Sequence, residues 1–254
     1  MKLLIDIGNT RIKWAFDNGG ELVGAGEALH GDNPARSAID FVAALEMAPE
    51  SAFAINVAGS AVEKTLADEL QARFGIGLAM VRTAERFGKV VNGYSSIEQL
   101  GADRWAAIVG GWQRCRQSVC IVDAGTAVTI DAVARDGHHQ GGIIVPGVAL
   151  MRASLHRDTS DIYRFFQQSE GAAAAGEWFG RDTQSGVERG AVFALGAAID
   201  KAVDEMIAAG EAPTVMLTGG DANILGAAIS HPFEACPLLV LEGLRHLAGG
   251  FADA

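Results

Sequence analysis

The chain has 254 residues, enough to bury a substantial core as one large domain or as two small ones. Its formal net charge of −11 at pH 7 argues against a general nucleic-acid binder and against attachment to an anionic membrane surface. We expect neither a signal peptide nor a membrane span, because no apolar stretch follows a basic start and none reaches the ~20 uncharged residues that a span requires. The three cysteines fit a cytoplasmic protein better than a disulfide framework.

The first half of the chain predicts an alternation of short strands and longer helices. Apolar runs at 3–7, 51–57 and 78–82 are typical of strands. Residues 61–74 place one apolar side chain on each turn of a helix, and 99–115 predict a longer helix.

The second half continues the alternation. Residues 118–137 predict two strands joined by a turn, and the apolar segment 141–147 follows them. A long helix is predicted at 185–210, and 214–229 predict a strand, a glycine turn and a helix. The mixture indicates an α/β protein.

One pattern occurs twice. "LLIDIGNT" at 3–10 resembles "CIVDAGTA" at 120–127, since each is an apolar strand that ends in Asp-x-Gly. The two segments are separated by nearly half the chain, which favours a duplicated domain, with 1–117 and 118–254 as the two parts. The alternative is chance, because Asp-x-Gly is a common turn after a strand.

Both turns suggest a site for phosphate. Glycine lets backbone N–H groups converge on an anion, and Asn9, Thr10 and Thr126 can add side-chain donors. The acids in the turns, Asp6 and Asp123, would repel phosphate unless a cation such as Mg²⁺ lay between them.

Two common nucleotide motifs are not found. The nearest approach to a Walker loop, "GSAVEKT" at 59–65, lacks the second glycine, and no GxGxxG follows a strand. A third glycine turn, "TGGD" at 218–221, is open to two interpretations: Asp221 as a helix N-cap, or a flat surface for adenine or ribose.

Five segments stand in a fixed order along the chain. They are "DIGNT" at 6–10 followed by Lys13, "LGADRW" at 100–105, "DAGTAVTID" at 123–131, "GGIIVPG" at 141–147 and "DTQSGVERG" at 182–190. Together they resemble the motifs of the type III pantothenate kinases, members of the acetate kinase, sugar kinase, Hsp70 and actin superfamily. The resemblance spans most of the chain.

This resemblance implies a duplicated actin-like (ribonuclease H-like) fold, with a mixed sheet in each of two domains and a cleft between them. It implies that ATP phosphorylates the primary hydroxyl of pantothenate, the first step of coenzyme A biosynthesis. It also implies a homodimer with the substrate pocket at its interface, and a requirement for K⁺ or NH₄⁺ as well as Mg²⁺.

The substrate residues follow from the "GADR" segment. Asp103 resembles the general base of the family, and Arg104 can pair with the carboxylate of pantothenate, while Gly101 and Ala102 let the substrate approach the backbone. On a helix Asp103 and Arg104 point about 100° apart, so they can serve one substrate only from the helix end. The alternative for these two residues is a surface ion pair.

Two further residues belong to the implied pocket. Tyr94 resembles the pocket tyrosine of the family, and Thr183 resembles the residue that reaches pantothenate from the partner subunit. Thr183 and the preceding Asp182 can equally be the capped start of the long helix.

The remaining implied ligands belong to the phosphate turns. Asp6 resembles the residue that faces Mg²⁺, and Asp123 resembles the ligand of the monovalent cation. The implied contacts to ATP are Asp6, Gly8, Asn9, Thr10, Lys13, Gly125 and Thr126.

The chain departs from the family pattern at two places. "SSIEQ" at 95–99 replaces the usual Asn-Pro, and 148–165 is less apolar than the family leads us to expect. His138, His139 and His156 show no metal-binding spacing, and we expect solvent-exposed side chains without a catalytic role.

Three other functions remain open on the sequence alone. A sugar or other small-alcohol kinase would keep both phosphate turns but would not need "GADR" together with Tyr94. A regulatory relative would be expected to have lost Asp6, Asp103 or Asp123, and all three are present. A phosphohydrolase would need an acid that activates water and no alcohol pocket.

Overall fold

The computed structural model describes residues 1–30, 33–158 and 178–250, and these form two compact units. The first unit comprises Met1–Arg116, Asp136–His139 and Leu238–Ala254, and the second comprises Gln117–Arg135 and Gln140–Pro237. The division after Arg116 lies beside the boundary predicted after residue 117. The C-terminal segment groups with the first unit, whereas the sequence assigned it to the second domain.

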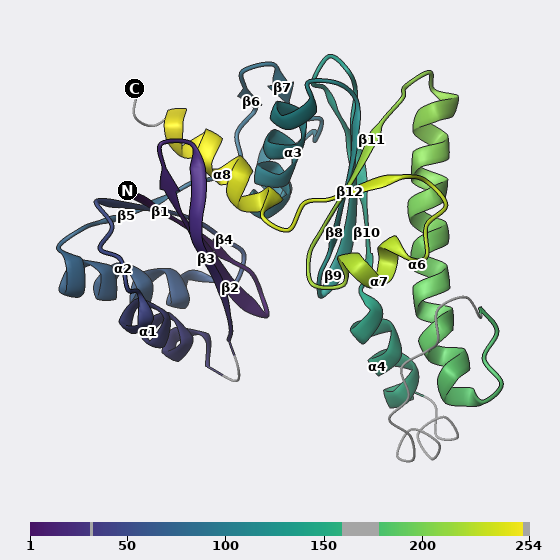
Figure 1. Cartoon of the computed structure of the whole chain (residues 1–254), viewed down its shortest axis with the longest axis horizontal. Coiled ribbons are helices and arrows are strands. Elements are labelled where there is room, and N and C mark those ends of the chain that lie inside the picture. Colours follow the sequence, from purple (N-terminus) through teal and green to yellow (C-terminus); the bar gives the residue numbers. More distant parts are fainter. Residues whose placement is uncertain (31–32, 159–177, 251–254) are drawn as a thin grey trace. The chain divides into compact units, whose positions relative to one another are not determined.

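The first unit contains a five-stranded mixed sheet in the order β3-β2-β1-β4-β5 (Figure 1). β1 pairs antiparallel with β2 and parallel with β4. The strands are β1 (Lys2–Ile7), β2 (Arg11–Asn18), β3 (Glu21–Leu29), β4 (Ser51–Asn56) and β5 (Leu78–Met80), with a small ribbon of β6 (Arg86–Phe87) and β7 (Val90–Val91). The helices are α1 (Pro34–Ala44), α2 (Ser60–Phe74), the 3₁₀ turn η1 (Ile97–Gln99), α3 (Ala102–Cys115) and α8 (Leu239–Gly250).

The second unit repeats this plan with the order β10-β9-β8-β11-β12. β8 again pairs antiparallel with the next strand and parallel with the strand that follows a helical crossover. The strands are β8 (Val119–Ala124), β9 (Ala127–Val133), β10 (His139–Pro146), β11 (Thr214–Thr218) and β12 (Phe233–Ala235). The described helices are α4 (Val148–Asp158), α6 (Thr183–Ala208) and α7 (Ala222–Gly226). The equal order of the strands, together with the equal directions of the pairings that β1 and β8 make, confirms the duplicated actin-like fold.

Close helix packing explains why α8 belongs to the first unit. A Cβ atom on Gly110 of α3 would lie 2.7 Å from the carbonyl oxygen of Leu239, and one on Gly243 of α8 would overlap Ala106. Only glycine allows the two helix backbones to approach this closely. The segment that ends the chain therefore completes the unit that begins it.

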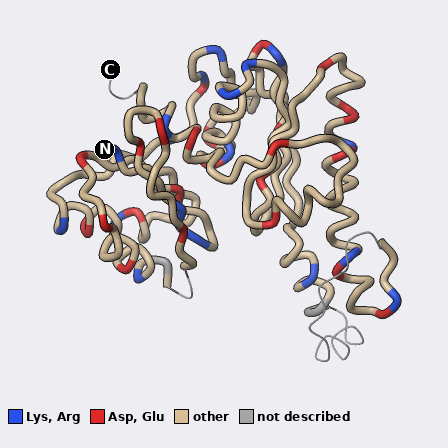
Figure 2. The backbone as a smooth tube through the Cα atoms, in the orientation of Figure 1, with Lys and Arg blue, Asp and Glu red and all other residues tan. Residues whose placement is uncertain are grey.

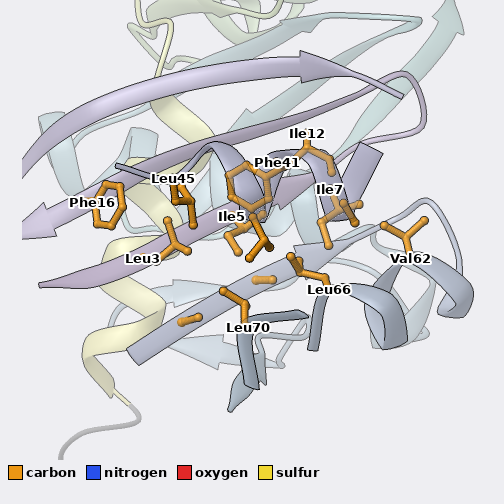
Figure 3. Close-up of a cluster of buried hydrophobic side chains, with 14 residues drawn as sticks. Leu3, Ile5, Ile7, Ile12, Phe16, Phe41, Leu45, Val62, Leu66 and Leu70 are labelled. Carbon is orange, nitrogen blue, oxygen red and sulfur yellow. The ribbon is translucent and has the colours of Figure 1, made fainter. Parts of the chain in front are cut away.

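The side chains of β1 alternate between two faces of the sheet, so that the hydrophobic core lies on one face and Asp6 on the other. Leu3, Ile5 and Ile7 are buried against residues of α1 and α2, as Figure 3 shows. Successive side chains of a strand point to opposite faces, so Asp6 belongs to the face away from this cluster. Cys120, Val122 and Ala124 of β8 lie in the corresponding cluster with α6, which leaves Asp123 on the other face in the same way.

Two helices begin at different residues than the sequence predicted. α3 starts at Ala102 instead of 99, because Gly101 has extended ψ and forms the N-cap. α6 starts at Thr183, two residues before the periodic segment 185–210, because the side chain of Asp182 accepts a hydrogen bond from the backbone N–H of Ser185 at 2.8 Å and caps the helix. This confirms the interpretation of Asp182 and Thr183 as the capped start of the long helix.

Charge and hydropathy fit these assignments. Basic residues are scattered among acidic ones on several elements of both units (Figure 2). Among the described residues, no helix has the length and apolar character that crossing a bilayer would demand. None of the three cysteines, all of which lie in the described ranges, forms a disulfide.

Candidate active site

The first turn of α3 holds a carboxylate in a defined position. Asp103 Oδ1 accepts a hydrogen bond from the backbone N–H of Arg104 at 2.7 Å, one of the donors that a helix N-terminus leaves unused. A Cβ atom on Gly101 would lie 2.5 Å from the same oxygen, so the carboxylate rests against the bare backbone of Gly101. Asp103 and Arg104 therefore both lie at the N-terminal end of α3, the arrangement that two neighbouring helix residues need in order to contact one substrate.

The side chain of Arg104 is buried and faces Tyr94. Its exposed fraction is 7%, its Nη1 donates to the Tyr94 hydroxyl at 2.8 Å, and its guanidinium lies 5.4 Å from the centre of the Tyr94 ring. Asn92 accepts a hydrogen bond from the backbone N–H of Tyr94 at 3.0 Å and so fixes the start of this loop. We call Tyr94, Gly101, Asp103 and Arg104 the acceptor cluster.

His139 is a neighbour of this cluster that the sequence misjudged. Its exposed fraction is 0%, and its ring stacks on Tyr94 with centroids 5.7 Å apart and an angle of 16° between the planes. The expectation of a solvent-exposed His139 is therefore wrong. His138 is exposed as expected, and the side chain of His156 lies outside the described residues.

The turn before β10 carries His139 to this place. The carbonyl oxygen of Gly137 accepts a hydrogen bond from the backbone N–H of Val91 at 3.0 Å. Gly137 has a φ of +92°, and a Cβ atom there would lie 2.6 Å from the carbonyl oxygen of Lys89. The residues around His139 do not predict which part of the chain it contacts. The one local signal is the glycine in "DGHH", which indicates a close approach of two backbones.

The first acid turn joins β1 to β2. Asp6 has an exposed fraction of 9% and stands directly opposite Lys13 in the antiparallel pair, so the two side chains share one face of the sheet. The backbone N–H of Gly8 closes the turn on the carbonyl of Arg11 at 3.0 Å. Asn9 and Thr10 are exposed at the tip, where they can contact a ligand.

The second acid turn joins β8 to β9, and two more glycine segments approach it. The N–H of Gly147 donates to the carbonyl of Thr126 at 2.9 Å, and a Cβ atom on Gly147 would lie 2.3 Å from the carbonyl oxygen of Gly125. Gly219 has a φ of +92°, and its Cβ would lie 2.6 Å from Asp123 Oδ1. The "GGIIVPG" and "TGGD" segments therefore meet at the Asp123 turn.

The donors at both turns suit hard cations. The carbonyl oxygen of Ala124 and the carboxylate oxygen Oδ1 of Asp123 both lie within 2.6 Å of the place that a Cβ atom of Gly219 would occupy, and oxygen ligands bind a hard cation such as Mg²⁺ better than a soft metal. Within 1–30, 33–158 and 178–250, no group of three or more His, Cys, Asp or Glu side chains could hold a metal ion by itself. The pattern fits an ion bound by one or two carboxylates together with water and phosphate oxygens.

Thr183 begins α6 in the second unit, beside a groove between α4 and α6. Hydrogen bonds from Ser185 lower the pKa of the preceding Asp182, which stays ionised at the helix N-terminus. The groove has a volume of about 460 Å³ and is lined by Met151, Ser154, Leu155, Thr183, Gly186, Val187, Gly190 and Ala191.

The other N-cap predicted from the sequence, Asp221, precedes α7 but makes no capping hydrogen bond with its side chain.

Comparisons with known proteins place relatives of the chain in one family. A family model described as type III pantothenate kinase matches residues 2–205. Type III pantothenate kinase of Chromobacterium violaceum is 36% identical over 252 residues, 98% of this chain and 99% of the relative, and that of Halorhodospira halophila is 35% identical over 97% of each chain.

Solved structures resemble the fold at lower sequence identity. A Sinorhizobium meliloti protein described as a 2-dehydro-3-deoxygalactonokinase has a TM-score of 0.62 at 12% identity, covering 100% of both chains. A Campylobacter jejuni protein described as a Baf family transcriptional activator has a TM-score of 0.58 at 20% identity, covering 99% of this chain and 100% of that one. These likenesses support the fold, and the family model with the curated relatives identifies the lineage: the chain belongs to the type III pantothenate kinase family.

Proposed function

We propose that this chain transfers the γ-phosphoryl group of ATP to the primary hydroxyl of pantothenate, giving 4′-phosphopantothenate, the first step of coenzyme A biosynthesis. The observation that carries the proposal is the acceptor cluster. A carboxylate and a buried guanidinium stand together at one helix N-terminus, which suits an acceptor that has both a hydroxyl and a carboxylate.

In this proposal Asp103 accepts the proton of the attacking hydroxyl, since a general base must lie within hydrogen-bond reach of the group that it deprotonates. Arg104 binds the carboxylate of pantothenate, and the Tyr94 hydroxyl at 2.8 Å holds the guanidinium plane for that contact. Gly101 and Ala102 present backbone to the substrate, and the dipole of α3 favours its negative charge.

ATP binds through the first acid turn. The backbone and side chains of Asn9 and Thr10 donate to phosphate oxygens, while Gly8, whose N–H closes the turn, lets the phosphate approach the backbone. Lys13 adds a positive charge on the face that it shares with Asp6. Asp6 would hold Mg²⁺, which when bound neutralises charge on the phosphates.

Asp123 would hold a monovalent cation such as K⁺ or NH₄⁺. The carbonyl oxygen of Ala124 and Oδ1 of Asp123 both lie close to the place that a Cβ atom of Gly219 would occupy, at 2.4 Å and 2.6 Å, and oxygen ligands of this kind suit a hard cation. Thr126 contributes donors to phosphate in the same turn, and Gly125, whose N–H donates to the carbonyl of Ala127 at 3.1 Å, lets the phosphate approach the backbone. This turn thus complements a negative ligand only after it has bound a positive ion.

We also propose a homodimer that uses the groove between α4 and α6. Large apolar side chains are exposed around it, and a groove next to Thr183 would let that residue complete the pantothenate pocket of a partner. Exposed fractions above 40% occur there at Leu150, Leu155, Trp178, Phe179 and Phe193. Molecular mass in solution tests this point, and a monomer at enzyme concentrations used in assays would contradict it.

The three cysteines, which form no disulfide, fit the reducing cytoplasm, where we place the protein.

The decisive assay is phosphorylation of pantothenate by the purified chain with ATP, Mg²⁺ and K⁺. Asp103→Asn should lower kcat by about 10²–10⁴-fold, the usual contribution of a general base. Asp68→Asn, an exposed acid on α2, serves as the matched control and should retain full activity.

Two results would contradict the proposal. Undiminished activity of Asp103→Asn would remove the assignment of the base. Phosphorylation of a hexose with none of pantothenate would instead make the chain a sugar kinase of the same superfamily.

A further inference from the structure

His30 lies against the first acid turn, although it follows that turn by twenty residues. It comes directly after β3 and has an exposed fraction of 3%. Its backbone N–H donates to the carbonyl of Thr10 at 2.9 Å, and its ring Nε2 lies 2.7 Å from the carbonyl oxygen of Gly8. One residue thus engages two carbonyls of a turn that we propose to bind phosphate.

The chemistry of this contact fixes the tautomer of the ring. A carbonyl oxygen can only accept, so Nε2 must carry the hydrogen and donate it. Among the described residues, the other ring nitrogen, Nδ1, has no hydrogen-bond partner even though it is buried. A buried nitrogen without a partner is unfavourable, so Nε2 supplies the favourable polar contact that the ring makes here.

The contact has a consequence on the other side of the peptide bond. In a planar trans peptide the C=O and the N–H point in opposite directions. Because His30 holds the Gly8 carbonyl on its own side, the N–H of Asn9 is directed away from His30. Asn9 is exposed at the tip of the turn, so this N–H is presented where an anion can reach it.

We propose that His30 is a positioning residue for the phosphates of ATP. It holds the Gly8–Asn9 peptide in the orientation that offers an N–H, and not a carbonyl oxygen, to the ligand. Without this contact the peptide can rotate and present its oxygen, which would repel phosphate. The proposal rests on the function proposed above, since it assigns ATP to this turn.

The test uses two substitutions at one position. His30→Gln keeps a donor near the place of Nε2, whereas His30→Phe keeps a ring of similar size without a donor. Ser37→Ala is the matched control, because the Ser37 hydroxyl donates to the His30 carbonyl at 2.7 Å and supports the same segment without a contact to the turn. Equilibrium binding of ATP with Mg²⁺, binding of adenosine, and the KM for each substrate are measured for all three variants.

His30→Phe should weaken ATP binding about five- to tenfold, the usual effect of one lost hydrogen bond. Its affinity for adenosine and its KM for pantothenate should stay within about twofold of the parent, as should all values for His30→Gln and Ser37→Ala. The separation of ATP from adenosine is a result that a purely structural role would not produce.

Three outcomes would overturn the proposal: ATP binding unchanged in His30→Phe, equal losses in His30→Gln and His30→Phe, or unfolding of His30→Phe, which would assign the ring to stability. The result also separates this proposal from the one on which it rests. A parent chain that binds ATP but does not phosphorylate pantothenate would end the proposed function, and the ATP comparison between the two variants would still decide the role of His30.

Discussion

Replacement of Gly101 by alanine should reduce catalysis without disturbing the fold. The backbone of Gly101, with φ −56° and ψ 143°, is open to alanine, so the substitution introduces no strain. Its new Cβ would, however, lie 2.5 Å from Asp103 Oδ1 and 3.7 Å from Cγ. The carboxylate is the free end of a side chain, and it is the group that must give way.

The size of the effect follows from the distance. An ordinary contact begins near 3.4 Å, so Oδ1 must move by about 0.9 Å and would loosen its 2.7 Å hydrogen bond from the N–H of Arg104. A misplacement of ~1 Å at a reacting group costs about 10²-fold in rate, or about 2.7 kcal/mol of activation free energy. We expect Gly101→Ala to lower kcat about 100-fold, with the KM for ATP unchanged.

Steady-state kinetics and a thermal melt check this prediction together. Gly77→Ala is the matched control, because a Cβ atom at Gly77 meets nothing within 4 Å. The melting temperature of Gly101→Ala should fall only slightly, because the restriction that alanine places on the unfolded chain offsets part of the cost of alanine at the N-cap and of the loosened hydrogen bond. Full kcat in Gly101→Ala would refute the placement of Asp103 as the base, and a large loss of stability would refute the claim that only the carboxylate moves.

Substitutions at three other positions test separate parts of the structure. His139→Ala should raise the KM for pantothenate about two- to tenfold, because the ring that stacks on Tyr94 is lost. His139→Phe should keep the stack and the KM of the parent chain. Equal KM values for the two variants would contradict a role of the His139 ring in supporting Tyr94. Asp123→Asn should abolish activation by K⁺ in a titration of kcat against KCl, and a preserved activation curve would place the cation elsewhere. Burial raises the pKa of Cys120 from 9.0 to about 12, so the folded state favours the neutral thiol and its stability should fall as pH rises from 9.0 to about 12. Urea unfolding of Cys120→Val across this range should show a smaller fall, and an identical fall would exclude Cys120 as a cause.

The sequence predicted those features that depend on neighbours in the chain. The apolar run before Asp6 forms a strand because alternate residues bury one face, and the glycine after it forms a turn because no side chain obstructs the backbone. The same local rules apply at Asp123, which is why the duplication could be recognised from two short segments.

Features that depend on distant contacts could not be predicted in this way. His139 is buried because a turn from another part of the chain docks beside β7, and His30 reaches Gly8 only because β3 ends next to the first turn. α8 joins the first unit through a glycine contact between two helices, and no periodicity within either helix specifies its partner. In each case the sequence shows the residue type but not the residues that surround it in the fold.

The two acid turns occupy equivalent positions but differ in one neighbour, and this difference predicts a change of cation dependence. Asp6 stands opposite Lys13, whereas Asp123 stands opposite Thr129 in the corresponding antiparallel pair. The first turn therefore has a permanent positive charge on the face of its acid, while the second has a neutral hydroxyl and, in our proposal, depends on a bound K⁺. Thr129→Lys would place an ammonium group where Lys13 stands in the first unit.

If charge is what K⁺ supplies, Thr129→Lys should phosphorylate pantothenate without added K⁺ and respond to it by less than about twofold. Thr129→Met, which is of similar length but neutral, is the control and should keep the dependence of the parent chain. The initial rate is measured in a sodium or Tris buffer with and without KCl. An ammonium group fixed in the protein cannot adjust its position as an ion can, so a modest loss in kcat is compatible with this reasoning. Unaltered K⁺ dependence in Thr129→Lys would contradict the prediction, because it would mean that the cation acts through coordination geometry or at a place remote from the Asp123 turn.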